Sequence, residues 1–292
     1  MSFRSSPVRS DELDDVFREA GMHGCLHVLD IDSGAEISLR GNDVCFSASV
    51  GKVPVLVALM QAVAAGTLKL EEQIDMPAGD RTGGPAGLSA MAYPARLALG
   101  DIAQLMMSVS DNHATDVVLQ RVPPGQVTAA MRDLGLTVTT LETTIKEFYA
   151  RVVAGDIDPR PEVAHWRTTP AEMCRLLQAI WRDEAAPAAQ CERMRALMRS
   201  CATSNGLDGG LPLDVQMTSG RKTGTLIGIE GEGEKRTVML MRNEVGVVEF
   251  PDGRRYAVAV FTHAEGADLR IRDAAASRTL GTAVRMAIDG LS

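Results

Sequence analysis

The sequence lacks the long apolar runs that mark membrane spans and secretory leaders. Its first fifteen residues, MSFRSSPVRSDELDD, contain no apolar stretch of the roughly 7–15 residues that a signal peptide needs. The best apolar window, residues 50–65, ends at Gly66 and falls short of the about 20 residues that cross a bilayer. We therefore expect a cytoplasmic protein with no membrane partner, or a secreted or periplasmic one if a targeting segment was removed.

Cysteines are few, and nothing in their spacing indicates a disulfide framework or a zinc site. They are odd in number and form no Cys-x-x-Cys pair: Cys25, Cys45, Cys174, Cys191 and Cys201. The histidines show no ligand spacing with cysteines or acids, and we expect His113 or His263 to be a packed, satisfied side chain. No metal is expected. A nucleotide cofactor is not expected either, because no glycine-rich phosphate loop follows a strand.

Positive charge is also in short supply. The 292 residues include 30 Lys and Arg against 38 Asp and Glu, a formal net charge of −8 that offers no basic footprint for nucleic acid. Hydrophobic residues make up 45% of the chain, enough for the core of one large domain or two interleaved ones. Oligomeric state cannot be read from these numbers.

The order of predicted elements indicates a discontinuous α/β (α+β) fold. After a flexible tail over residues 1–9, the patterns predict a helix over 11–20 and two strands joined by a turn at 32–34. Strand patterns return from Gln216, with a hairpin at the turn PDGRR, and a final helix is predicted over 267–288. We predict an antiparallel sheet flanked by N- and C-terminal helices, built from residues 10–45 plus 203–292.

The middle of the chain, residues 46–202, is predicted to be an inserted all-helical subdomain. Apolar residues recur there at spacings of three and four, which is the period of an amphipathic helix. The windows that carry this pattern are 50–65, 99–109, 114–120, 126–134 and 170–182.

Three short motifs follow one another along the chain: S-x-x-K at 49–52, S-D-N at 110–112 and K-T-G at 222–224. S-x-x-K also occurs a second time, at 219–222. The first copy opens a helical run, where positions three apart share a face, so Lys52 can reach the Ser49 hydroxyl. The second copy lies in a strand-like segment, where positions three apart point to opposite faces. Only Ser49 can therefore use its lysine as a base.

A serine hydroxyl is a weak nucleophile until a neighbouring base removes its proton. A lysine can be that base if its pKa is depressed, which burial and nearby cations such as Lys222 would achieve. A serine at a helix N-terminus also offers its backbone N–H to a developing oxyanion.

Each motif has an ordinary structural alternative. Ser49 could be a plain helix N-cap and Lys52 a solvent-facing side chain. S-D-N could be a common loop between helices, and K-T-G a strand followed by a bulge glycine. The three motifs together, each in its expected context, favour the catalytic interpretation.

The three motifs together resemble those of class A β-lactamases and penicillin-binding proteins. The surrounding text is similar too, as in DNHAT at 111–115, TTPAEM at 168–173 and NEVG at 243–246, and the resemblance covers about residues 12–290. It implies Ser49 as the nucleophile, Lys52 as its base partner and Ser110 as the proton relay to the leaving nitrogen. It also implies a set of groups that bind the substrate or its oxyanion: Asn112, Lys222, Thr223, Gly224 and Thr225.

The chain departs from this family where a glutamate should activate the deacylating water. Glu147 lies close to the expected spacing, but Arg151 stands where the family has asparagine. Glu147 is thus either the deacylation base or a surface charge with Lys146. Residues 157–167 and the charged stretch 230–236 look like insertions.

The resemblance implies a serine hydrolase acting through an acyl-enzyme on a small-molecule substrate, first of all a β-lactam amide, and with it a link to antibiotic resistance. The alternatives are a cytosolic esterase or amidase of the same architecture and a penicillin-binding-like protein that releases its acyl group slowly. A non-catalytic ligand sensor is an alternative of another class.

Overall fold

The computed structural model describes residues 8–154, 165–207, 209–211, 218–230, 237–265 and 269–292. The predicted tail and the two insertions therefore lie largely outside the described residues. The chain divides into two compact units. The sheet unit comprises Met1–Asp43, Thr169–Gln178 and Ser204–Ser292, and the helical unit comprises Val44–Thr168 and Ala179–Thr203.

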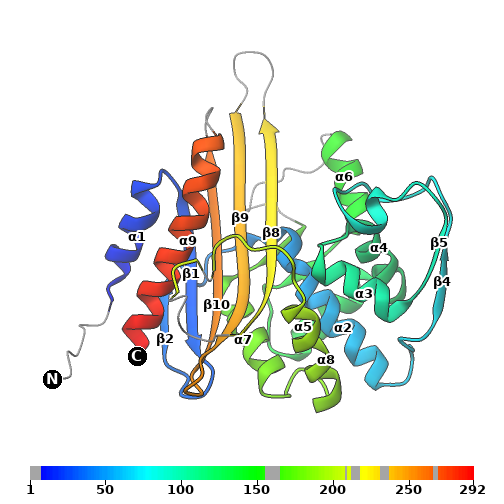
Figure 1. Ribbon diagram of the computed structural model, residues 1–292, viewed down its shortest axis with the longest axis horizontal. Helices are drawn as coiled ribbons and strands as arrows, with labels where there is room; N and C mark the ends of the chain where they lie inside the picture. Colours follow the sequence, from blue (N-terminus) through cyan, green and yellow to red (C-terminus); the bar gives the residue numbers. More distant parts are fainter. Residues whose placement is uncertain (1–7, 155–164, 208, 212–217, 231–236, 266–268) are drawn as a thin grey trace. The chain divides into compact units, whose positions relative to one another are not determined.

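The sheet unit contains a five-stranded antiparallel sheet in the order β2-β1-β10-β9-β8, so β8 is at one edge (Figure 1). The strands are β1 (His23–Asp30), β2 (Glu36–Leu39), β8 (Thr218–Glu230), β9 (Thr237–Glu249) and β10 (Arg255–Glu265). The predicted hairpin is confirmed, because Arg255 pairs with Glu249 and Phe250 N donates to Arg254 O at 2.9 Å across the turn.

Helices α1 (Ser10–Glu19) and α9 (Leu269–Leu291) pack against each other and against this sheet (Figure 1). Alternate residues of a strand face one side of the sheet. Those of β1 and β10 that join the helices in one core are valines, a leucine and Tyr256. The central members are Leu13, Phe17, Leu26, Val28, Val258, Val260, Leu280 and Val284. Gly24 makes room for an aromatic ring: a Cβ there would lie 2.3 Å from Cγ of Phe17.

The helical unit is organised around a helix that is buried on nearly all sides, α2 (Lys52–Ala64). Its neighbours within the unit are α3 (Leu99–Ser108), α4 (Asn112–Arg121), α5 (Pro124–Asp133) and α8 (Ala188–Arg199). A sixth helix, α6 (Ile145–Ala154), contacts α4. The described helices α2 to α5 match predicted windows, whereas no window covered α6 or α8.

The prediction of an all-helical insertion is wrong in one respect, because this unit also holds two small sheets. One joins β3 (Cys45–Phe46), β7 (Trp166–Thr168) and β6 (Thr140–Leu141), and the other joins β4 (Gln73–Met76) to β5 (Ala95–Ala98). Strands of two to four residues are too short to show an alternating pattern. Tertiary pairing alone creates them.

The predicted boundary between the two subdomains is also wrong at helix α7 (Pro170–Trp181), which the prediction placed wholly in the helical insertion. The part of α7 up to Gln178 belongs to the sheet unit. The Cys174 thiol donates to His27 O at 3.2 Å, and Gln178 Nε2 donates to Ile31 O at 3.1 Å. These contacts to β1 and the residue after it explain why Thr169–Gln178 belongs with the sheet.

The predicted architecture is confirmed in outline: an antiparallel sheet with N- and C-terminal helices and a long, mainly helical insertion. Among the described residues, no helix combines the length and the apolar character that crossing a membrane requires. All five cysteines have free thiols.

Candidate active site

Ser49 lies in a short 3₁₀ turn, Ala48–Gly51, that leads directly into α2. The amide of Lys52 donates to Ser49 O, an i→i+3 bond that sets the two residues one 3₁₀ turn apart on the same side. The half-buried Ser49 is not the N-cap of α2, because that position is Gly51. The residue before it, Ala48, is held at φ 47°, a conformation that costs energy for a residue with a Cβ.

Lys52 is fully buried, which excludes the solvent-facing alternative. Its Nζ donates to the carbonyl oxygen of Ser110 at 2.6 Å, to Ser110 Oγ at 3.1 Å and to Asn112 Oδ1 at 3.0 Å. A buried ammonium group is tolerated when hydrogen-bond acceptors replace its water. The structure thus joins the S-x-x-K and S-D-N motifs through the lysine.

The S-D-N loop is more than a common connection between helices. Asp111 is buried and caps α4, accepting from the amides of His113 at 3.0 Å and Ala114 at 3.2 Å. The same carboxylate accepts from the amides of Leu88 and Ser89 and from Ser89 Oγ. This network holds the loop while Ser110 adopts φ 58° and turns its oxygen atoms to Lys52.

Asp116, one turn into α4, fixes the start of α6. Its carboxylate accepts from the amides of Ile145 at 2.8 Å and Lys146 at 2.9 Å and from Thr82 Oγ1 at 2.6 Å. Burial raises the pKa of Asp116, and these hydrogen bonds oppose the rise. Thr82 N also donates to Nδ1 of His113, and burial lowers the pKa of that imidazole, as expected for a packed histidine.

Glu147 lies at the first turn of α6, where its carboxylate is bound to the backbone. It is exposed, and its Oε2 accepts from the amide of Thr144 at 2.8 Å, while Thr144 Oγ1 accepts from the Glu147 amide at 3.2 Å. This reciprocal pair is a capping box at the first turn of α6. The neighbouring Lys146 is exposed as well and pairs with Asp80.

Helix α6 places Tyr149 beside Asn112, one of the residues that bind Lys52. The Tyr149 hydroxyl accepts from Asn112 Nδ2 at 3.4 Å, and Asn112 Nδ2 also donates to Gly83 O at 3.0 Å. Burial raises the pKa of the Tyr149 phenol. Sequence reasoning missed Tyr149, and no local pattern marks it, because its contact with Asn112 depends on how α6 packs on α4.

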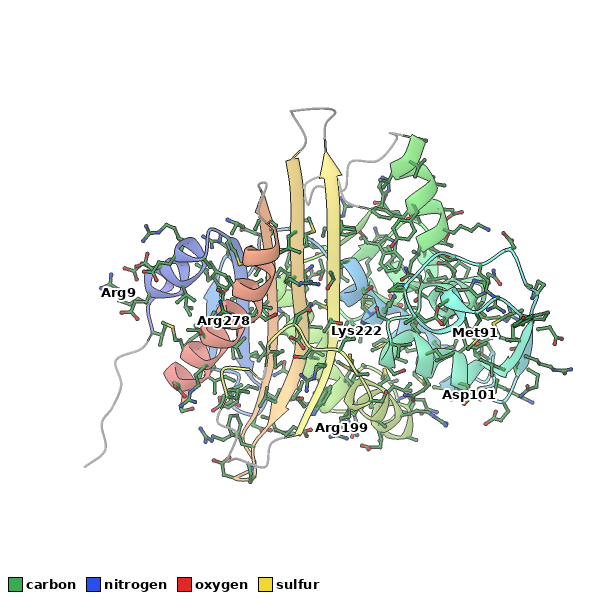
Figure 2. All side chains as sticks on the ribbon, turned by 45° about the horizontal axis from the view of Figure 1, so that its top comes forward. Arg9, Met91, Asp101, Arg199, Lys222 and Arg278 are labelled. Atoms are coloured by element: carbon green, nitrogen blue, oxygen red, sulfur yellow. The ribbon has the colours of Figure 1, made fainter. Side chains whose placement is uncertain are left out.

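The K-T-G motif lies in β8 of the sheet unit, where Figure 2 labels Lys222. Lys222 is fully buried, and its Nζ donates to Thr223 O at 2.9 Å. The pairing with β9 runs without interruption through Gly224, which faces Asn243, so Gly224 is not a bulge. In the second S-x-x-K copy, Ser219 Oγ accepts from Arg221, as expected for a strand that separates Ser219 from Lys222.

Three residues that sequence reasoning missed support this strand. The side-chain Nδ2 of Asn205 donates to Gly224 O at 3.2 Å. The backbone N–H of Asn205 donates to Oε2 of the buried Glu244 at 2.9 Å. Arg242 donates to Oγ1 of the exposed Thr225 at 2.6 Å. The predicted residues therefore form two groups, one in each unit: Ser49, Lys52, Ser110 and Asn112 in the helical unit, and Lys222 to Thr225 in the sheet unit.

Comparison with known proteins gives consistent results along the chain. The model of the β-lactamase enzyme family matches residues 9–290. The β-lactamase regulatory protein BlaB of Streptomyces cacaoi is 29% identical over 289 residues, which cover 87% of this chain and 88% of that protein.

Solved structures share the fold. A β-lactamase from Sphaerobacter thermophilus superposes with a TM-score of 0.79 at 24% identity, covering 98% of this chain and 99% of that one. PBP-A superposes with a TM-score of 0.77 at 23% identity, covering 95% and 93%. A single-residue mutant of PBP-A is known as an acyl-enzyme complex with penicillin G.

Proposed function

Because the chain belongs to the β-lactamase enzyme family, we propose that it is a serine hydrolase that forms an acyl-enzyme on Ser49, with a β-lactam amide as the substrate class. The observation that carries this proposal is the buried Lys52, which lies one turn from Ser49 and is bound to Ser110 and Asn112. Neither a plain N-cap nor a solvent-facing lysine accounts for that arrangement.

In the proposed acylation, Lys52 in its neutral form accepts the Ser49 proton as Oγ attacks the carbonyl carbon. The backbone N–H groups of Ser49 and Thr225 stabilise the oxyanion that develops. As the amide bond breaks, Ser110 Oγ passes a proton from Lys52 to the leaving nitrogen. The 3.1 Å contact between Lys52 Nζ and Ser110 Oγ supports this relay.

The resemblance assigns the substrate contacts to residues of both groups. Asn112 holds the amide of the substrate side chain, and Lys222, Thr223 and Gly224 bind the carboxylate end. The ammonium group of Lys222 suits a substrate that carries a negative charge. Asn112 is itself held by Gly83 and Tyr149, which fixes the direction of its amide.

A second candidate function is slow release of the acyl group, as in a penicillin-binding or β-lactam-responsive regulatory protein. The favouring observation is that the Glu147 carboxylate is occupied in the capping box with Thr144. A protein that lacks a deacylation base would acylate and then remain modified. The similarity to a regulatory protein and to PBP-A supports the same alternative.

One experiment separates the candidates. The protein is mixed with a chromogenic cephalosporin, and the colour change and the intact mass are followed together. Sustained turnover without a stable adduct supports a β-lactamase, and a single-turnover burst with a persistent adduct on Ser49 supports slow release. Cleavage of simple esters with neither signal would point to an esterase.

The Ser49→Ala variant should lose both the colour change and the adduct, because the substitution removes the proposed nucleophile. The exposed Ser204→Ala, in the sheet unit, is the matched control and should behave like the wild type. Turnover that survives in Ser49→Ala would disprove the assignment of the nucleophile.

A further inference from the structure

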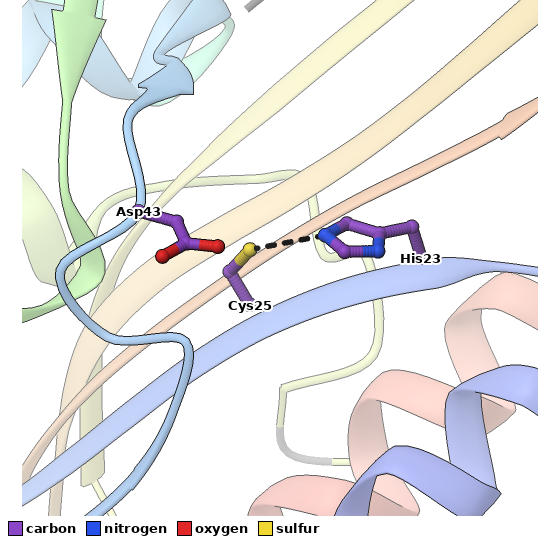
Figure 3. A group of neighbouring side chains, drawn as sticks. All are labelled: His23, Cys25 and Asp43. Carbon is purple, nitrogen blue, oxygen red and sulfur yellow. Dashed lines mark hydrogen bonds between the residues drawn. The ribbon is translucent and has the colours of Figure 1, made fainter.

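A group of metal-binding side chain types lies in the sheet unit, away from K-T-G. His23 and Cys25 are two residues apart on β1, so they point to the same face of the sheet. Asp43, which follows β2 in the chain, comes to the same place (Figure 3). One ligand atom from each side chain lies within 4.8 Å of the other two, and Cys25 Sγ is 3.7 Å from His23 Nε2.

A second imidazole lies on the neighbouring strand, beside the three ligand atoms that lie within 4.8 Å of one another. His263 on β10 pairs directly with His23, and residues paired across an antiparallel ladder share a face. The two imidazole rings have their centroids 4.9 Å apart. His263 is half-buried, so its ring nitrogen atoms are not sealed in the core.

We propose that His23, Cys25 and Asp43, whose ligand atoms already lie together, bind a thiophilic divalent cation, of which Zn²⁺ is the type, and that His263 turns in as the fourth ligand. A thiolate, two imidazoles and a carboxylate are ligands that Zn²⁺ takes in tetrahedral sites. Zn–S and Zn–N bonds of about 2.3 Å and 2.0–2.1 Å place sulfur and nitrogen about 3.6 Å apart at a tetrahedral angle. The observed 3.7 Å between Cys25 Sγ and His23 Nε2 already meets that spacing.

The charges suit a dication as well. The thiolate and the carboxylate supply two negative charges, and neutral imidazoles add none. Arg40, which binds the backbone between His23 and Cys25, also donates through its guanidinium to Asp14 at 2.6 Å. Asp14 therefore offsets the positive charge that would otherwise oppose a metal ion.

Arg40 also explains how Asp43 reaches β1. The Asp43 amide donates to Arg40 O at 3.0 Å, and Arg40 Nε donates to Gly24 O at 2.8 Å. Gly24 stands between His23 and Cys25, so the loop is tied to the strand at the centre of the proposed site. The donors are thus brought together before any metal binds, which lowers the ordering entropy that binding must overcome.

No metal was expected from the sequence, and the reason is topological. The donors come from β1, from the loop after β2 and from β10, and no sequence spacing connects these segments. The metal site is also independent of the acyl-enzyme, because none of its residues belongs to the groups around Ser49 or Lys222. Failure of one proposal leaves the other standing.

The test is titration of the chelator-treated full-length protein with ZnCl₂ by calorimetry, and with Co²⁺ as a spectroscopic probe. We expect one Zn²⁺ per chain and a thiolate-to-cobalt charge-transfer band. Cys25→Ser should abolish that band. His23→Gln and Asp43→Asn change exposed side chains and should keep the fold while weakening Zn²⁺ at least tenfold.

The control is Cys201→Ser, which removes a half-buried thiol of the helical unit and should change neither the stoichiometry nor the band. A wild-type protein that binds no Zn²⁺, or binding that persists unchanged in Cys25→Ser and His23→Gln, would overturn the site. Unchanged affinity in His263→Gln would overturn the four-ligand form.

Discussion

A lysine ammonium group enters a protein interior at a high cost unless oxygen atoms replace the water around it. Lys52 meets this condition through three acceptors on Ser110 and Asn112. Two of them belong to one residue, Ser110, whose left-handed backbone turns both of its oxygen atoms toward Nζ. Strain of this kind persists only where the surroundings enforce it, and the many hydrogen bonds of Asp111 do so here.

Substitutions of Glu147 can distinguish a role in capping α6 from a role in deacylation. Because glutamine also completes a capping box, we expect Glu147→Gln to leave deacylation unchanged and Glu147→Ala to lower stability by about 0.5–1 kcal/mol. Stopped-flow measurement of acyl-enzyme decay and urea unfolding check the two effects. An acyl-enzyme that accumulates in Glu147→Gln would instead make Glu147 the deacylation base.

At the level of elements, α6 is positioned by the side chains at its first turn. Thr144 and Glu147 cap it from within, and Asp116 of α4 binds two of its free amides. A carboxylate is the natural partner of a helix N-terminus, since it satisfies amides and complements the dipole. These hydrogen bonds between α4 and the start of α6 position Tyr149 beside Asn112.

The buried carboxyl of Asp116 should make stability depend on pH. Its pKa is raised in the folded protein, so between the ordinary value of 3.8 and the raised value the folded state binds more protons than the unfolded state. Stability contributed by this group therefore falls as pH rises through that window. The Asp116→Asn variant lacks this ionisable group. Its stability relative to the wild type should therefore increase as the pH rises through the same window.

Urea unfolding at a series of pH values from acidic to neutral measures the effect. Asp101→Asn, at an exposed position of α3, is the matched control and should keep a constant difference from the wild type. If the difference in unfolding free energy between Asp116→Asn and the wild type also stayed constant with pH, the pKa of Asp116 would not be raised by folding.

The contact between α1 and β1 gives a second prediction for elements. Phe17 is fully buried against Gly24, where a Cβ would lie 2.3 Å from the ring. Phe17→Ala should cost about 3–5 kcal/mol of unfolding free energy by leaving a cavity. Gly24→Ala should destabilise the wild type by overpacking, yet cost less in the Phe17→Ala background, where the methyl group finds space. Additive effects in this double-mutant cycle would contradict the contact.

At the scale of the whole molecule, the predicted residues are divided between the two units, and the proposed chemistry needs both. The nucleophile, its lysine and the proton relay come from the helical unit, whereas the groups for the substrate carboxylate come from β8. In the proposed function, the long insertion between the two parts of the sheet unit therefore provides the reacting groups, and the sheet provides the groups for the substrate carboxylate.

Lys222→Met tests this division of labour. A charge-assisted hydrogen bond contributes about 1.5–3 kcal/mol, so the second-order rate constant for acylation by a carboxylate-bearing β-lactam should fall about 10- to 100-fold. A methyl ester of the same compound should react with wild type and variant at similar rates. Equal losses for both compounds would mean that Lys222 does not act on the carboxylate, provided thermal melting shows both proteins folded.

The sequence by itself determined what depends on neighbours along the chain. The spacing of Ser49 and Lys52 is meaningful only in a helical turn, and the apolar run after it predicted that turn. The hairpin at PDGRR and the strand character of β8 followed from alternation and turn residues, which separated Ser219 from Lys222. Helix α6 lies outside the predicted helical windows, although Thr144 and Glu147 have the spacing of a capping box.

Only the tertiary structure decided which distant residues meet. The burial of Lys52, its contact with Ser110 and the position of Tyr149 beside Asn112 arise from helices packing on one another. Asp43 and His263 reach β1 in the same way, through a loop contact and a strand pairing. Local pattern reports period and propensity, whereas these contacts depend on loop closure and packing over long chain separations, which no local pattern encodes.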